Sequence, residues 1–200
     1  FGIPLGFYAA IKQGTPTDPI IVSLTLILYA MPVFLTAPLL IIIFALELSW
    51  VPVSGWGGIF DKRAILPAIT VGLPGIAVIA RLMRASTLDV IGQEFITFAK
   101  AKGVDRFSIN FKHVGRNAIL PVVTVLGLSF SGMLGGALIV ELIFGIPGVA
   151  RFALDAIFSR DYPIIMALTL IGTASLVVAN LIVDILYVFL DPRIKYSNEN

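Results

Sequence analysis

The sequence predicts an all-α membrane protein, a polytopic bundle of transmembrane helices. Only 13% of its residues are charged, about half the fraction of a soluble domain, and the mean hydropathy is +1.00. Residues 19–46, 64–80, 117–140 and 162–183 carry no charge, and about 20 apolar residues suffice for a helix to cross the hydrocarbon. These stretches do not alternate as barrel strands would, so helices, which satisfy their own backbone hydrogen bonds, are favoured.

The first eleven residues are biased toward apolar types and predict the cytoplasmic end of a helix that begins before residue 1. The transmembrane spans are expected at approximately 19–46, 64–82, 117–142 and 162–190. Small residues give the third of these spans a face on which another helix could pack closely, at Gly132, Gly135 and Gly136. Prolines are expected to kink or locally open the helices at Pro32, Pro38, Pro67, Pro74 and Pro121.

The distribution of cations predicts the orientation. If the spans alternate sides, Lys12, the stretch 81–116 and the C-terminal tail share one side, which holds ten of the fourteen Lys and Arg residues. That side is expected to be cytoplasmic, with Trp50 and Trp56 at the outer interface. The basic balance is therefore a sign of topology and does not indicate nucleic-acid binding.

Residues 94–121 stand out because they are rich in Lys and Arg and periodic rather than uniformly apolar. Leu88, Ile91, Phe95 and Phe98 have the spacing of one helical face, and Ser86 is expected to cap the start of this helix.

A second short helix is expected after the first. Gly103 can end the first helix in a left-handed conformation, and Asp105 can cap the second, which would present Phe107, Phe111 and Val114 on one side. The pattern of helix, glycine, helix is too amphipathic to span a membrane. Its apolar face is expected to rest on the membrane surface or in a groove of a partner protein.

Two long stretches, 97–172 and 180–194, together with residues 2–6 ("GIPLG") and 50–57 ("WVPVSGWG"), resemble the inner-membrane permease subunit of binding-protein-dependent ABC importers. The resemblance is to the dipeptide and oligopeptide branch, which also includes nickel and glutathione permeases. It implies a type I ABC importer permease fold over residues 1–200, multi-pass in the inner membrane. It also implies that N-terminal helices of the full protein precede residue 1, so that the four expected spans are its third to sixth.

Permeases of this family carry a cytoplasmic "EAA" loop that docks into a groove of the ATPase subunit, and the resemblance places this coupling loop at residues 83–116. The start of the motif falls on Thr97, Phe98 and Ala99, with Gly103 at the glycine position. Thr97 replaces the acidic residue of the family pattern and Phe98 replaces its first alanine. The candidate coupling residues are Thr97, Phe98, Ala99, Lys100, Ala101, Lys102, Gly103, Asp105, Phe107, Phe111, His113, Arg116, Asn117 and Pro121.

Other polar residues have a structural and a functional interpretation. His113 is the only histidine, without a second ligand at metal spacing, so packing is favoured over metal binding. Asp184, an intramembrane acid, fits a functional role or a structural pair, and Glu141 fits a solvated helix end better than a gate. The resemblance makes 144–163 an external loop, and the candidates for a gate or binding-protein contact are Glu141, Pro147, Gly148, Asp161, Tyr162 and Pro163.

The sequence contains no phosphate-binding loop and no nucleophile with a neighbouring base, so the chain is expected to be a transport subunit and not an enzyme. The resemblance implies that ATP and Mg are bound by two ABC ATPase subunits, and that a homologous second permease subunit and an extracytoplasmic binding protein complete the importer. No cofactor or metal is expected on this chain. An ion-gradient-driven secondary transporter or channel is the alternative, but the spans lack ionisable residues at their centres; a scaffold without transport is a third interpretation.

Overall fold

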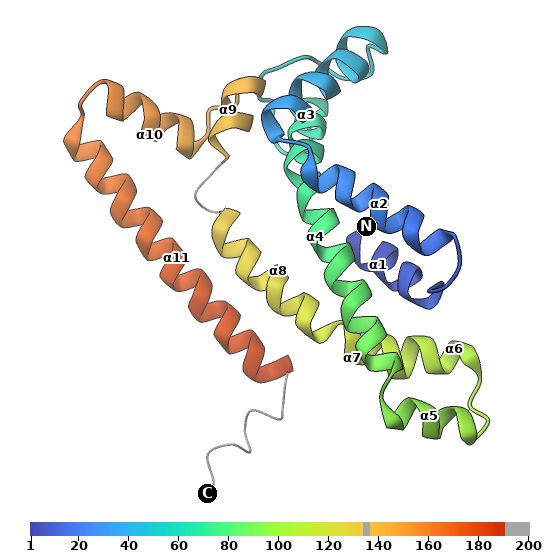
Figure 1. Ribbon diagram of the computed structural model, residues 1–200. Helices are drawn as coiled ribbons and strands as arrows, with labels where there is room; N and C mark the ends of the chain where they lie inside the picture. Colours follow the sequence, from blue (N-terminus) through green and yellow to red (C-terminus); the bar gives the residue numbers. More distant parts are fainter. Residues whose placement is uncertain (134–136, 191–200) are drawn as a thin grey trace, which may run out of the picture. The chain divides into compact units, whose positions relative to one another are not determined.

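The computed structural model describes residues 1–133 and 137–190, and these residues form helices and connecting loops without a β-strand (Figure 1). This confirms the all-α prediction. Within these described residues two helices are long and apolar enough to cross a membrane, Lys62–Ile91 and Tyr162–Ile182, and a third candidate is the bent pair Thr17–Ala30 and Val33–Glu47. Contacts divide the described residues into two units, one made of residues 1–29, 75–128 and 182–190, the other of 30–74, 129–133 and 137–181.

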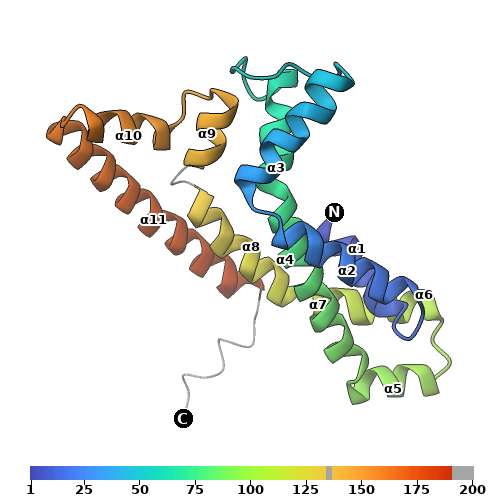
Figure 2. The ribbon, with the colours of Figure 1, turned by 45° about the horizontal axis from the view of Figure 1, so that its top comes forward.

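In the first unit, α1 (Gly2–Ile11) and α2 (Thr17–Ala30) lie beside the C-terminal part of α4 (Ile65–Ile91), as Figures 1 and 2 both show. Glycines let α1 approach α4 closely. A Cβ on Gly6 would overlap the carbonyl oxygen of Ala80, and one on Gly2 would lie 2.7 Å from the carbonyl oxygen of Ile76. This pair of glycines four residues apart is the small-residue contact that helices use in membranes.

A salt bridge joins α2 to α4. The Arg84 guanidinium donates from Nε to Asp18 Oδ1 at 2.6 Å and from its terminal nitrogen to Asp18 Oδ2 at 2.7 Å. One turn earlier on α4, the Arg81 guanidinium lies over the Tyr29 ring, 4.5 Å from its centroid. Because bidentate pairs fix geometry as well as charge, these contacts set how α2 lies on α4.

The second unit is built from α3 (Val33–Leu40), the π-helix η1 (Ile41–Glu47), the short turn η2 (Lys62–Ala64), the start of α4, and α9 (Leu138–Phe144). Its core consists of buried side chains from these helices: Ala37, Ala45, Leu66, Val140 and Phe144. The amphipathic α10 (Val149–Phe158) and the long α11 (Tyr162–Leu190) follow α9 in the chain.

The prolines act as predicted at three positions. Pro32 is the N-cap of α3 at the break after α2, Pro38 lies inside α3 just before the π-helix, and Pro121 follows the turn between α7 (Arg116–Ala118) and α8 (Leu120–Met133). Pro67 and Pro74 lie inside α4, which continues through both. The predicted small face lies outside the described residues, because 134–136 are not described and neither is the side-chain environment of Gly132.

Candidate functional site

The first helix of the loop begins later than predicted. α4 continues through Ser86 and ends at Ile91, and α5 (Glu94–Ala101) begins after a break, with Gln93 at its N-cap. The predicted cap at Ser86 is therefore wrong: its hydroxyl is buried and donates to the Ala118 carbonyl oxygen at 2.8 Å. The apolar spacing from Leu88 onward belongs to two helices rather than one.

The turn and the second helix follow the prediction. Gly103 has a positive φ of 77°, the left-handed conformation that glycine adopts without strain. Asp105 accepts a hydrogen bond from the Ser108 backbone N–H at 2.8 Å and so caps the helix made of α6 (Arg106–Ser108), the π-helix η3 (Ile109–Gly115) and α7. This hydrogen bond from Ser108 lowers the pKa of Asp105 below its ordinary value.

The two helices of the loop share a small core of their own. Ile96 of α5 and Val114 of η3 are fully buried, Ile109 is 4% exposed, and Ala99 and Val104 pack against them. Val114 therefore faces inward, whereas Phe107 and Phe111, predicted to share its side, are exposed. The loop is a packed two-helix element, since its apolar residues hold it together before any partner is bound.

This loop is joined to the membrane helices at two places. The Ser86–Ala118 hydrogen bond connects α4 to α7, and Phe7 of α1 lies against Phe111 with ring centroids 5.5 Å apart. Phe7 and Val90 also contact both the loop core and the neighbouring cluster of Ile79, Met83, Ala118 and Val122. The loop and the adjoining ends of α1 and α4 thus form one continuous packed body.

The predicted coupling residues lie on the outside of this element. All fourteen are exposed except Ala99 and His113, which are half-buried. Phe98 and Phe107 are 68% and 70% exposed, and the ring of Phe107 lies against that of Phe111, with ring centroids 4.6 Å apart and the planes tilted by 35°. His113 uses its backbone carbonyl to accept a hydrogen bond from the Asn117 amide at 2.6 Å.

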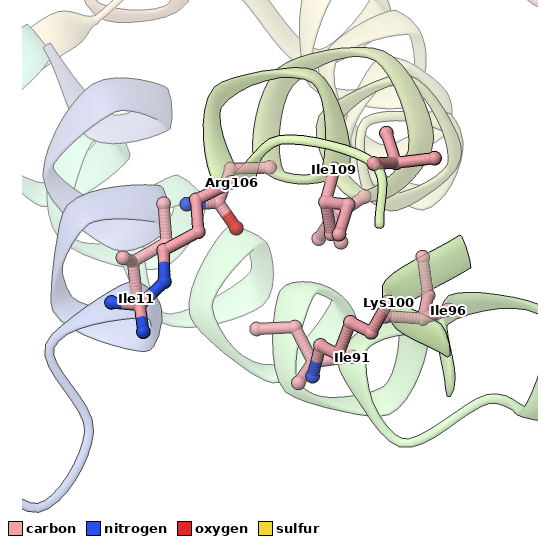
Figure 3. Close-up of a pocket in the computed structure, with 9 residues that line it drawn as sticks. Ile11, Ile91, Ile96, Lys100, Arg106 and Ile109 are labelled. Atoms are coloured by element: carbon pink, nitrogen blue, oxygen red, sulfur yellow. The ribbon is translucent and has the colours of Figure 1, made fainter. Parts of the chain in front are cut away.

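A cavity of about 610 Å³ lies between α5 and the second helix of the loop (Figure 3). Its walls include Ile11, Ile91 and Ile109, and two cations border it, Lys100 from α5 and Arg106 from α6. Figure 3 shows Arg106 reaching toward Ile11 of α1 and Lys100 reaching toward Ile91. Within the described part of the chain neither cation forms a salt bridge, so both are open to an acidic group.

The predicted external residues lie around the ends of α9, α10 and α11. Glu141 is 7% exposed and accepts a hydrogen bond from the Arg151 backbone N–H at 2.7 Å, so the solvated helix end expected for it is wrong. Asp161 caps α11 by accepting from the Ile164 N–H at 3.2 Å. Pro147, Tyr162 and Pro163 are exposed and Gly148 is half-buried.

The last polar candidate, Asp184, lies on α11, and its side-chain environment is not described. Among the described residues no group of three His, Cys, Asp or Glu side chains could hold a metal ion. Two places in the described part of the chain bring predicted site residues together: the two-helix loop of residues 94–121 and the corner between α9 and α10.

Comparison with known proteins decides the family. Residues 2–196 match the family described as binding-protein-dependent transport system inner membrane component. The chain belongs to this permease family. It is 39% identical over 195 residues to the oligopeptide transport system permease protein OppB of Haemophilus influenzae and 37% identical to that of Salmonella typhimurium. It is 38% identical over 225 residues to the dipeptide transport system permease protein DppB of Escherichia coli.

The match covers 98% of this chain but 64% of each OppB protein and 66% of DppB. The chain thus spans about two thirds of the length of these permeases. The resemblance to the dipeptide and oligopeptide branch is confirmed by these relatives. The sequence patterns did not predict contacts between residues that are distant along the chain, such as the Asp18–Arg84 salt bridge and the Ser86–Ala118 hydrogen bond.

Proposed function

We propose that this chain is the membrane-spanning part of a permease subunit in an ATP-driven importer that takes up peptides. The names of its relatives, oligopeptide and dipeptide transport system permease proteins, support the substrate class. Nickel chelates and glutathione are the other solutes of the same branch. Energy would reach the permease from separate ATPase subunits through the 94–121 segment.

The main support for this proposal is that the loop of residues 94–121 has a buried core of its own and is attached to α4 and α1. A loop that only rested on lipid would not need a buried core of its own, yet Ile96, Ile109 and Val114 provide one. A loop that had to transmit movement would need rigid attachment to a membrane helix, and the Ser86–Ala118 hydrogen bond and the Phe7 contacts supply it. Displacement of the loop would then displace α4 and α1 with it.

The exposed face of the loop is the surface that would meet the ATPase. Phe98 and Phe107 offer exposed aromatic side chains to an apolar groove of the ATPase, and aromatic residues including Phe are enriched in the cores of protein interfaces. Lys100 and Arg106 would meet acidic groups on the same partner. ATP and Mg would be held by the ATPase, and this chain would supply no catalytic group.

The importer would contain a second, homologous permease subunit, two ATPase subunits and an extracytoplasmic binding protein. On ATP binding the ATPases would close beneath the two permeases and move the coupling loops, which would open the path toward the binding protein. Release of the hydrolysis products would return the path to the inward-facing state.

Reconstitution of the full-length permease with these subunits in liposomes tests the proposal. We expect uptake of di- or oligopeptides that needs ATP, Mg and loaded binding protein, together with ATP hydrolysis that the loaded binding protein stimulates. Peptide uptake driven by an ion gradient without ATP would support the secondary transporter instead. Uptake of a nickel chelate or glutathione in place of peptides would retain the importer and reassign its substrate.

A further inference from the structure

The corner between α9 and α10 holds a buried acid that no part of the proposed transport cycle uses. Glu141 lies on α9, seven residues before Gly148, the N-cap of α10, and only 7% of it is exposed. A buried carboxylate is costly unless it is hydrogen-bonded. The chain reverses at Gly145, which has a φ of 65°, and this reversal brings the start of α10 back to Glu141.

Glu141 caps α10 from another helix. The first N–H groups of a helix have no partner within it, and Gly148 has no side chain with which to cap α10. The Glu141 carboxylate fills this role, since its Oε2 accepts from the Arg151 N–H at 2.7 Å. Its negative charge also suits the positive end of the helix dipole.

Gly148 makes room for the carboxylate. A Cβ at this position would overlap the Glu141 carboxyl carbon and its oxygens. The backbone of Gly148, at φ −97° and ψ 173°, is extended and open to any residue. The need for glycine here therefore comes from Glu141 and not from backbone conformation, so the two positions form one unit.

The corner is also closed by backbone hydrogen bonds. Ile146 N–H donates to the Glu141 carbonyl at 2.9 Å, Gly148 N–H donates to the Ile146 carbonyl at 2.9 Å, and Gly55 N–H donates to the Phe144 carbonyl at 2.8 Å. Phe144 is 1% exposed in the core that α9 shares with α3 and α4. A rigid corner thus connects α10 to the core of the second unit.

We propose that Glu141 is a positioning residue whose carboxylate, accommodated by Gly148, fixes α10 to α9, so that contact of the binding protein with α10 is transmitted to α3 and α4. The inference rests on the proposed function and on the resemblance that makes residues 144–163, which contain α10, an external loop, because the binding protein would press on α10 from that side. It assigns no ligand to Glu141. It predicts that the carboxylate acts mainly through its hydrogen bond, and that its charge adds a smaller contribution at the start of α10.

Four variants of the full-length permease in the complete complex test this: Glu141→Gln, Glu141→Ala, Gly148→Ala and the double variant Glu141→Ala/Gly148→Ala. Stimulated ATP hydrolysis is measured against the concentration of loaded binding protein. Glu141→Ala and Gly148→Ala should each raise the concentration of loaded binding protein needed for half-maximal stimulation by about fivefold, the factor for losing one helix cap. Glu141→Gln keeps an acceptor oxygen but loses the charge, so it should stay closer to the wild type than to Glu141→Ala.

The double variant separates coupling from independent damage. Truncating Glu141 empties the space that an alanine Cβ at 148 needs, so the double variant should be no worse than Glu141→Ala alone. Multiplied effects of the two substitutions, or a Glu141→Gln variant as impaired as Glu141→Ala, would overturn the inference. Hydrogen exchange at the Arg151 amide gives a readout that does not depend on transport: it should quicken in Glu141→Ala and not in Glu141→Gln. If the wild-type complex shows no stimulated hydrolysis, the proposed function fails, while the exchange result still decides whether Glu141 holds α10.

Discussion

The salt bridge between Asp18 and Arg84 allows a quantitative prediction of how a substitution changes the free energy of unfolding. The Asp18→Asn variant leaves Arg84 without its bidentate partner on α2. Breaking a buried pair by removing one partner costs about 3–5 kcal/mol. The Asp18 side chain is 9% exposed and that of Arg84 is 27% exposed, so the remaining charge reaches water in part. We expect a loss of about 2–3 kcal/mol in the free energy of unfolding, somewhat below the range for fully buried pairs.

A second Asp–Arg pair among the described residues serves as a matched control. Asp61 and Arg63 are 3.9 Å apart and their side chains are 35% and 43% exposed. Such exposed pairs contribute about 0–1 kcal/mol, and asparagine preserves the cap that Asp61 provides to the Arg63 N–H. Asp61→Asn should therefore change the free energy of unfolding by less than about 1 kcal/mol.

Denaturant unfolding of the full-length permease in detergent micelles, followed by circular dichroism, measures both variants. A double-mutant cycle with Arg84→Gln isolates the pairwise energy. A coupling energy below about 0.5 kcal/mol, which is the ordinary deviation from additivity, would refute the account of this contact. So would an Asp61→Asn variant that is as destabilised as Asp18→Asn.

Two further predictions concern α1 and the two-helix loop of residues 94–121. Gly6→Ala places a Cβ on the Ala80 carbonyl of α4 and should destabilise the protein by about 1–3 kcal/mol in the same unfolding assay. Gly172→Ala is its control, since nothing lies within 4 Å of a Cβ there; no loss for Gly6→Ala would contradict the packing. The hydrogen bond from the Ser108 N–H lowers the pKa of Asp105 in the folded loop. The ionised carboxylate therefore contributes its full stabilisation of the loop at pH values above the unfolded pKa of about 3.9. The stabilisation is lost as the pH falls through the lower, folded pKa. The Ser108 amide of the wild type should be protected from hydrogen exchange at neutral pH, and this protection should be lost in acid. The Asp105→Ala variant should lack the protection already at neutral pH; equal protection in variant and wild type would contradict the cap.

The sequence predicted the features that depend on local chemistry. Pro32 cannot continue α2, Gly103 can adopt a left-handed turn, and Asp105 can cap the helix that follows, so each could be placed from its neighbours alone. The helix, glycine, helix pattern of the loop is confirmed for the same reason.

Features that depend on distant residues could not be predicted in this way. The spacing from Leu88 to Phe98 fits one helix, but α4 extends to Ile91 before α5 begins, so Ser86 contacts Ala118 instead of capping. Glu141 was expected at a solvated helix end because nothing in its neighbourhood shows that the chain reverses at Gly145. In a membrane protein the hydrophobic pattern also does not show which side of a helix is packed, because lipid-facing and buried residues are both apolar.

Transport by a Gly103→Val variant tests most directly whether the coupling loop carries energy from the ATPase to the membrane helices. Gly103 and Gly14 have φ values of 77° and 81°, and nothing lies within 4 Å of a Cβ at either. Valine should strain both turns by about 1–3 kcal/mol, so the variants differ in location and not in backbone cost. In reconstituted complexes we expect Gly103→Val to lower stimulated ATP hydrolysis and peptide uptake together by about tenfold, within the range that such strain allows, while Gly14→Val stays near the wild type. A Gly103→Val complex that assembles with the ATPases and transports at the wild-type rate would contradict the account.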